Sequence, residues 1–220
     1  MDTLPVPLLP FLPLETGWDS PLLAGLPAVS LNHFRPEGSA HRPATEIRLY
    51  RSVAGLHGLF RVRDRYVRSV HTRFCDPVYE DSCVEFFFRP DISAGYFNFE
   101  FNAGGAMLAG FVTDHRRTGK GLRGFTPLSP EDAGKVGVKS SLPPTVFPEV
   151  QEPLHWTLAF FIPFEIVEKY VGKPLGGDNR WRGNFYKCGD RTSHPHWSSW
   201  MPLPEKNFHL PETFGELVFE

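Results

Sequence analysis

The chain has 220 residues and a formal net charge of −2 at pH 7. This length suits one domain or two small ones, and the charge supplies no global field to steer the protein onto nucleic acid or an anionic membrane, so neither is an expected partner. Twenty Phe, six Tyr and five Trp, dispersed among 22 Pro and 20 Gly, favour many short strands joined by turns. No apolar run in the sequence reaches the roughly 18–20 residues of a membrane-spanning helix.

The first 30 residues are apolar, but they lack the pattern of an export signal. Asp2 stands where such a signal carries basic residues, and four prolines interrupt the apolar stretch. These prolines are Pro5, Pro7, Pro10 and Pro13. We expect residues 1–30 to lie extended along one domain formed by residues 31–220, and we expect a cytoplasmic protein.

The chain contains three cysteines, which are Cys75, Cys83 and Cys188. Their number is odd and no two of them form a CxxC pair, so at most one disulfide bridge can form and a disulfide framework is not expected. We predict that they are buried free thiols.

The first half of the chain contains four predicted strands, over residues 46–51, 59–63, 82–89 and 96–102. The last of these is the clearest, because Phe alternates with Asn and Glu, and a period of two is typical of a strand with one buried face. In the strand before it, the same period places Glu85 on the face opposite Phe86 and Phe88. If the two strands pair as a hairpin, Glu85 and Glu100 lie on comparable faces.

The second half contains a predicted helix and three more strands, over residues 156–162, 183–188 and 216–220. The helix covers residues 163–171, because Pro163 suits a first helical turn and apolar residues follow it at a spacing of three. Residues 114–154 are rich in Gly, Pro, Lys and Ser and are predicted to form long loops with one or two edge strands. Together these elements predict an all-β fold, an antiparallel, jelly-roll-like β-sandwich with one short helix and long loops.

A pair of carboxylates is the first candidate for chemistry. Glu85 lies between apolar residues but on the face opposite the core, so it needs a partner or a polar ligand. The strand over residues 96–102 carries Asn98, Glu100 and Asn102 on its polar face. Two nearby carboxylates can hydrolyse a glycosidic bond, or they can accept hydrogen bonds from sugar hydroxyls. The alternative is the ordinary solvated face of a one-sided sheet.

An aromatic segment near the C-terminus is the second candidate. Trp197 and Trp200 lie in a stretch rich in Ser, Pro and His, where an aromatic ring can offer its flat apolar face to the C–H side of a pyranose. The alternative is that one ring closes the end of the sandwich. A metal site is a further alternative, although the ligand spacing matches no standard zinc pattern. Its ligands would be His194, His196, His209 and Cys188.

With these residues in view, the chain resembles the family-9-like carbohydrate-binding modules, which belong to a wider group of β-sandwich domains that bind sugars or haem. The resemblance runs in order through most of the chain after about residue 30, and the N-terminal stretch and residues 114–154 lie outside it. The matching segments are VYEDSCVEFFF (78–88), YFNFEFNAGG (96–105), WTLAFFIPFEI (156–166), GNFYKCGD (183–190), HWSSW (196–200) and FHLPETFGELVFE (208–220).

The resemblance implies that two aromatic rings clamp a sugar while an acidic residue hydrogen-bonds its hydroxyls. Tyr79 matches the first ring, where the family usually has Trp, and Glu85 matches the acid. Trp200 matches the second ring, with Trp197 as its near neighbour. Asn184 stands where the family has polar ligands. The family also holds structural Ca²⁺, whose ligands are not located in this sequence, and no other cofactor is expected.

We therefore expect a non-catalytic domain that binds a mono- or oligosaccharide. One alternative is a glycoside hydrolase that uses Glu85 and Glu100. A second is a haem- or metal-binding domain whose axial ligands come from Met107, Met201, His194 and His196. A third is an interaction domain whose sugar site has decayed. The predicted sugar-binding residues are Tyr79, Glu85, Asn98, Glu100, Asn184, Trp197 and Trp200.

Overall fold

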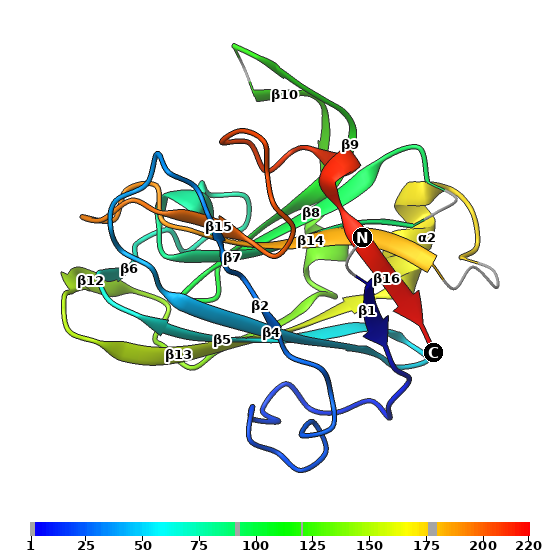
Figure 1. Cartoon of the computed structure of the whole chain (residues 1–220). Coiled ribbons are helices and arrows are strands. Elements are labelled where there is room, and N and C mark those ends of the chain that lie inside the picture. The colour runs from blue at the N-terminus through cyan, green and yellow to red at the C-terminus, as the bar shows by residue number, and fades with distance from the viewer. Residues whose placement is uncertain (1–2, 91–92, 120, 176–179) are drawn as a thin grey trace.

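The computed structural model describes residues 3–90, 93–119, 121–175 and 180–220, and it has two stacked layers of β-strands (Figure 1). The strands before residue 91 are β1 (Thr3–Val6), β2 (Val29–Ser30), β3 (His33–Phe34), β4 (Ala44–Arg51), β5 (Gly55–Asp64), β6 (Val67–Ser69) and β7 (Cys83–Pro90). The later strands are β8 (Tyr96–Asn102), β9 (Met107–Thr118), β10 (Gly121–Pro127), β11 (Gly137–Ser140), β12 (Val146–Val150), β13 (Leu154–Pro163), β14 (Arg180–Cys188), β15 (Trp197–Ser199) and β16 (Gly215–Phe219). The helical segments are α1 (Pro130–Ala133), α2 (Phe164–Val171) and the 3₁₀ turns η1 (Val78–Glu80) and η2 (Pro211–Thr213).

One layer is a nine-stranded sheet and the other is a five-stranded sheet, counted over the described residues. The first has the order β1-β16-β14-β7-β8-β9-β10, with β15 pairing with β14 and β3 pairing with β15. The second has the order β11-β13-β5-β4-β2, and β12 pairs separately with β6. β1 runs parallel to β16, whereas the neighbouring strands of both sheets otherwise run antiparallel. The predicted antiparallel β-sandwich is therefore confirmed.

The seven predicted strands correspond to β4, β5, β7, β8, β13, β14 and β16, and the predicted helix corresponds to α2. Pro163 precedes α2 as its N-cap, and Gly172 ends the helix with a φ of 74°, in the left-handed region that glycine adopts at little cost. Neither α-helix of the described residues has the length and apolar character needed to cross a membrane.

Residues 114–154 are more regular than predicted. They hold the end of β9, followed by β10, α1, β11 and β12. β10 and β11 are edge strands, one in each sheet, in agreement with part of the prediction. The additional helix α1 begins at Ser129, whose hydroxyl accepts a hydrogen bond from the Asp132 amide. The sequence pattern does not predict these short strands, because they contain glycine and proline and because an edge strand with little buried surface shows no strict apolar alternation.

The core lies between the two sheets, where β7 and β8 turn one face inward as predicted. Their fully buried inward residues are Val84, Phe86, Phe88, Phe97, Phe99 and Phe101. Phe86 stacks on Phe185 of β14 with 4.7 Å between ring centroids, and it also faces Phe160 of β13 in the opposite sheet. Each fully buried Phe contributes roughly 1.5–3 kcal/mol relative to an exposed one. The opposite faces of β7 and β8 therefore point away from the core, to the outer side of the nine-stranded sheet.

The N-terminal segment covers the outer face of the five-stranded sheet, beneath which it loops in Figure 1. β1 first adds a parallel strand beside β16. The chain then packs a small apolar cluster against Tyr50, Leu59 and Ala159 of β4, β5 and β13. The N-terminal members of this cluster are Leu12, Trp18, Leu23 and Leu26.

Candidate functional site

A cavity of about 450 Å³ lies on the outer face of the nine-stranded sheet. Its floor comes from β7, β8 and β14, and its walls come from the β9–β10 hairpin, from η1, and from the segments on either side of β15. The β9–β10 hairpin projects away from both layers, and so forms a raised wall beside the sheet (Figure 1). The lining residues beyond those on the floor include Tyr79, Leu108, Arg117, Phe125, Trp197 and Phe208.

The floor carries the two carboxyl groups that the sequence placed on comparable faces. Glu85 and Glu100 are direct cross-strand partners in the β7–β8 pair, and they are 2% and 5% exposed. Asn98 donates a hydrogen bond from Nδ2 to Glu100 Oε1 at 3.0 Å. The second oxygen of Glu100 and Oδ1 of Asn98 are both buried and have no hydrogen-bond partner in the described structure. Since buried polar atoms are nearly always paired, these two oxygens are available for hydrogen bonds with a ligand.

Burial also controls the charge of this floor. It raises the pKa of Glu100 to about 7, and it raises the pKa of Glu85 well above its ordinary value. Cys188 of β14 donates from Sγ to Glu85 Oε1 at 3.1 Å, and Cys83 lies directly opposite Cys188. Burial raises the pKa of both thiols. Below about pH 7 the floor therefore consists largely of uncharged acids, amides and thiols, which both donate and accept hydrogen bonds.

Aromatic rings stand on the walls above this polar floor. Trp197 donates from Nε1 to Asp190 Oδ1 at 2.6 Å, and Lys206 Nζ lies 3.2 Å from the centroid of the Trp197 ring. Tyr79 is 40% exposed, and its carbonyl accepts a hydrogen bond from the Asp190 amide at 3.1 Å. Phe208 is held by stacking on a buried tyrosine of β14. The 188–191 turn thus fixes both Tyr79 and Trp197 at the same pocket.

Five of the seven predicted site residues line the pocket, and these are Tyr79, Glu85, Asn98, Glu100 and Trp197. The structure places Trp200 in the core instead, where its ring packs on Phe185 with 5.8 Å between centroids. The ring available beside Tyr79 is therefore Trp197. Asn184 is also fully buried and lies outside the pocket lining, because its Oδ1 accepts hydrogen bonds from the amides of Met201 and Phe185.

The sequence reasoning missed the β9–β10 wall and the segment after β15. Arg117, Leu122 and Phe125 lie in the region that was expected to form loops, so nothing in the pattern placed them beside β8. Lys206 belongs to a segment without regular periodicity, and His209 in the same segment was considered only as a metal ligand. His209 is held with its Nδ1 2.7 Å from a buried tyrosine hydroxyl, and burial lowers its pKa to about 3.

The histidines that suggested a metal site are dispersed. His209 and Cys188 line the pocket, whereas His194 stacks on Tyr66 with 3.6 Å between ring centroids and His196 lies in a separate polar cluster. The haem candidates Met107 and Met201 both pack against the hydrophobic core. The residues grouped for these two alternatives therefore do not share one site.

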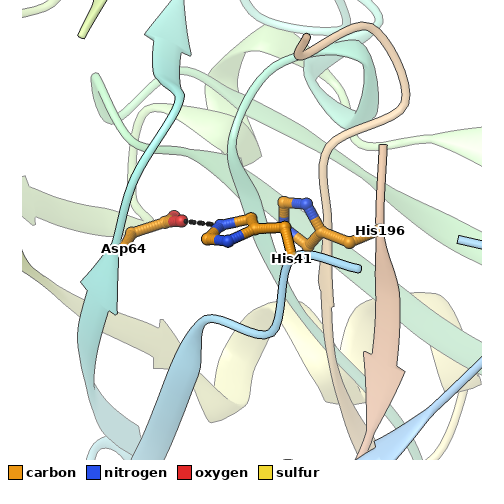
Figure 2. A group of neighbouring side chains, drawn as sticks. All are labelled: His41, Asp64 and His196. Carbon is orange, nitrogen blue, oxygen red and sulfur yellow. Dashed lines mark hydrogen bonds and ion pairs between the residues drawn. The ribbon is translucent and has the colours of Figure 1, made fainter. Parts of the chain in front are cut away.

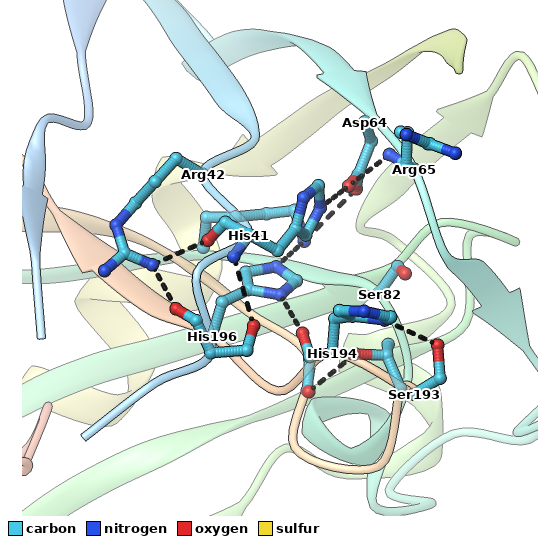
Figure 3. A network of polar contacts seen from close by, with 12 residues as sticks. His41, Arg42, Asp64, Arg65, Ser82, Ser193, His194 and His196 are labelled. Carbon is cyan, nitrogen blue, oxygen red and sulfur yellow. Dashed lines mark hydrogen bonds and ion pairs between the residues drawn. The ribbon is translucent and has the colours of Figure 1, made fainter. Parts of the chain in front are cut away.

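The separate polar cluster links β5 of the five-stranded sheet to β14 of the nine-stranded sheet, and Figures 2 and 3 show its members His41, Asp64 and His196. His41 Nε2 lies 2.8 Å from Asp64 Oδ1 and stands edge-on to the ring of His196. Lys187, which is fully buried, places Nζ 2.6 Å from His196 Nε2 and 3.3 Å from Asp64 Oδ2. His41, Asp64 and His196 have the mutual spacing of metal ligands, but the ammonium of Lys187 already supplies the positive charge there.

Cys83, Glu85 and Cys188 are a second set whose donor atoms lie within 4.8 Å of one another. A metal ion requires deprotonated thiols, and burial opposes their deprotonation by raising the pKa of both. The set is better suited to hydrogen bonding in its protonated state.

The structural comparisons agree with this architecture. Over 99% of its length the chain is similar to 99% of a candidate carbohydrate-binding protein from Bacteroides uniformis ATCC 8492, with 30% sequence identity and a TM-score of 0.84. A carbohydrate-binding module of family 9 from Caldicellulosiruptor kristjanssonii in complex with cellotriose has a TM-score of 0.66 at 12% identity, covering 100% of this chain and 94% of that one. The same organism's family 9 module in complex with glucose has a TM-score of 0.64 at 11% identity, covering 98% and 95% of the two chains.

The comparison with curated proteins finds no significant match. The family model of carbohydrate-binding family 9 matches residues 24–219, a range that includes residues 114–154. The resemblance noted in the sequence is thereby confirmed, and it extends through the segment that was expected to lie outside it. The chain belongs to carbohydrate-binding family 9.

Proposed function

We propose that the protein binds one sugar unit in the pocket on the outer face of the nine-stranded sheet, as a non-catalytic module. The observation that carries the proposal is the pair of buried, unpartnered oxygens on the pocket floor, Glu100 Oε2 and Asn98 Oδ1, beneath the aromatic rings of Tyr79 and Trp197. Sugar hydroxyls, which both donate and accept hydrogen bonds, would pair with these oxygens while the rings cover the C–H face of the sugar. The complexes of family 9 modules with cellotriose and glucose support a saccharide ligand.

The position of the two carboxyls favours binding over hydrolysis. A glycosidase places its acid and its nucleophile or base on either side of the bond that is cleaved. Here Glu85 and Glu100 rise from adjacent positions of neighbouring strands, so both approach a bound sugar from below. Glu85 is also engaged by the Cys188 thiol. Both groups are therefore suited to hold hydroxyl groups.

The proposal is tested by isothermal titration calorimetry with a panel of monosaccharides and short β-glucan, xylan and chitin oligomers. We expect affinities in the micromolar to millimolar range, which corresponds to roughly −8 to −4 kcal/mol. Trp197→Ala should weaken binding at least about tenfold, because it removes a stacking ring. Trp200→Phe keeps an aromatic ring in the core and should leave binding unchanged. An equal loss of affinity in Trp197→Ala and Trp200→Phe would contradict the proposal. The absence of any heat of binding for the natural protein and for both variants would also contradict it.

A chromogenic glycoside separates binding from hydrolysis. The proposal requires that the protein releases no chromophore above the buffer rate. Turnover that disappears in Glu85→Gln would instead establish the glycoside hydrolase alternative.

A further inference from the structure

Two cationic side chains line the pocket from different elements. Arg117 belongs to β9, near the tip of the β9–β10 hairpin, and Lys206 belongs to the segment between β15 and β16. The Arg117 guanidinium makes no hydrogen bond or ion pair with the described residues. Its neighbour Arg116, in contrast, donates from Nε and Nη2 to the two carboxylate oxygens of Asp114, at 2.9 and 2.6 Å. A guanidinium that forms no direct contact with an acid of the described chain is available to a carboxylate of a ligand, which it can bind bidentately.

Among the described residues, the acids of the pocket form no ion pair with these cations, although the charges of Arg117 and Lys206 act to lower the pKa of Asp190 and that of Arg117 acts to lower the pKa of Glu100. Asp190 is occupied by the indole N–H of Trp197 at 2.6 Å, on the same wall as Lys206. Glu85 and Glu100 are buried on the floor, where burial raises the pKa of both groups and brings that of Glu100 to about 7. Below that pH the floor offers hydrogen bonds without negative charge. Below about pH 7 an anion in the pocket therefore meets Arg117, Lys206 and Asp190 on the walls and no carboxylate charge on the floor.

Lys206 also controls access to the stacking ring. Its Nζ lies 3.2 Å from the centroid of the Trp197 ring, so the ammonium covers the ring face where a sugar would stack. A neutral sugar must displace this ammonium without offering it a counter-charge. A ligand carboxylate would offer the ammonium a counter-charge, and pairing with it would move the ammonium off the ring.

We propose that the natural ligand of the pocket is an acidic sugar, a hexuronic acid unit whose carboxylate is held between Arg117 and Lys206 while its hydroxyls reach the floor. This inference rests on the proposed sugar-binding function and adds the ligand class to it. The inference depends on one arrangement: the Arg117 guanidinium, which has no ion-pair partner among the described residues, and the Lys206 ammonium both line a pocket whose floor is polar and buried.

The test compares sugars that differ only at C6. Glucuronate and galacturonate carry a carboxylate where glucose and galactose carry a hydroxymethyl group. Calorimetric titrations at pH 6 and low ionic strength should show each uronate binding at least about tenfold more tightly than its neutral counterpart. This preference should shrink several-fold between 20 and 300 mM NaCl, because salt screens charges at an exposed rim.

Variants assign the preference to the two cations. Arg117→Gln and Lys206→Gln should each remove most of the uronate preference, whereas Arg116→Gln, the matched control one residue away and outside the pocket, should keep it. Neutral sugars that bind as tightly as uronates, or a preference that survives both pocket variants, would overturn the acidic-sugar inference and leave the sugar-binding function standing. A protein that binds none of the four sugars, nor the neutral oligomers above, would refute both.

Discussion

Glu100 offers a prediction whose sign and size both come from its place in the pocket. Its carboxyl group is 5% exposed, and burial raises its pKa from 4.5 to about 7. The folded state therefore keeps the proton of Glu100 at pH values where the unfolded chain has already lost it. By linkage, the free energy of unfolding falls as pH rises from about 4.5 through about 7. We expect Glu100→Gln, which resembles the protonated acid but does not titrate, to remove this loss.

The magnitude follows from the interval between the two pKa values. Each pH unit of difference corresponds to 1.36 kcal/mol, so the interval from 4.5 to about 7 amounts to about 3 kcal/mol. The amide keeps the oxygen that accepts the hydrogen bond from Asn98, so that contact is retained. Relative to the natural protein, Glu100→Gln should therefore gain about 3 kcal/mol between pH 4.5 and pH 8, with most of the gain between pH 5 and 7.

The assay is reversible urea unfolding of the natural protein and of Glu100→Gln at pH 4.5, 5.5, 6.5 and 8. Glu152→Gln is the matched control, because Glu152 is an exposed carboxyl outside the pocket, and its stability should follow the natural protein at every pH. A difference between Glu100→Gln and the natural protein that does not change with pH would refute the reasoning. A difference that shrinks as pH rises would mean that the folded state favours the charged carboxylate.

Two further predictions concern stability. Lys187→Met should lower the free energy of unfolding, measured by chemical denaturation, by about 3–5 kcal/mol, because it leaves the buried carboxylate of Asp64 without its cation. Adding Asp64→Asn should recover part of this loss. A double variant that is no more stable than Lys187→Met alone would contradict this account. Gly55→Ala should cost about 1–3 kcal/mol, since its Cβ would lie 2.2 Å from the Ile162 carbonyl oxygen, whereas Gly17→Ala, with nothing within 4 Å, should change the melting temperature little.

The alternation of side chains made the fold and the pocket floor predictable. In residues 96–102 a period of two separates Phe from Asn and Glu, and this pattern identifies both the strand and its faces. The pairing of Glu85 with Glu100 then follows from two adjacent strands that form a hairpin. These inferences need only local pattern and one short connection, which is why they hold.

The choice between the two tryptophans could not be made in this way. Trp197 pairs with Cys188 of β14, whose side chain faces the pocket. Trp200 lies an odd number of residues after Trp197, so its side chain points to the opposite face of the sheet and contacts Phe185 in the core. The decision depends on the register of β15 against β14, and a slip of one residue would exchange the faces. No local pattern sets that register, because β15 is only three residues long. For the same reason the sequence did not predict that Arg117 lines the pocket, because its position depends on how β10 pairs with β9.

We infer that the polar cluster behind the pocket fixes the register of β15. Lys187 and Cys188 turn to opposite sides of β14, and His196 and Trp197 do the same at the start of β15, so the Lys187–His196 contact of 2.6 Å lies directly behind the pocket wall. Buried polar contacts of this kind are a means of specifying register. We expect His196→Ala to weaken sugar binding several-fold although His196 does not line the pocket. Calorimetry measures the affinity, and the emission spectrum reports whether Trp197 has moved. A folded His196→Ala protein with natural affinity and an unchanged spectrum would show that the wall keeps its register without the cluster.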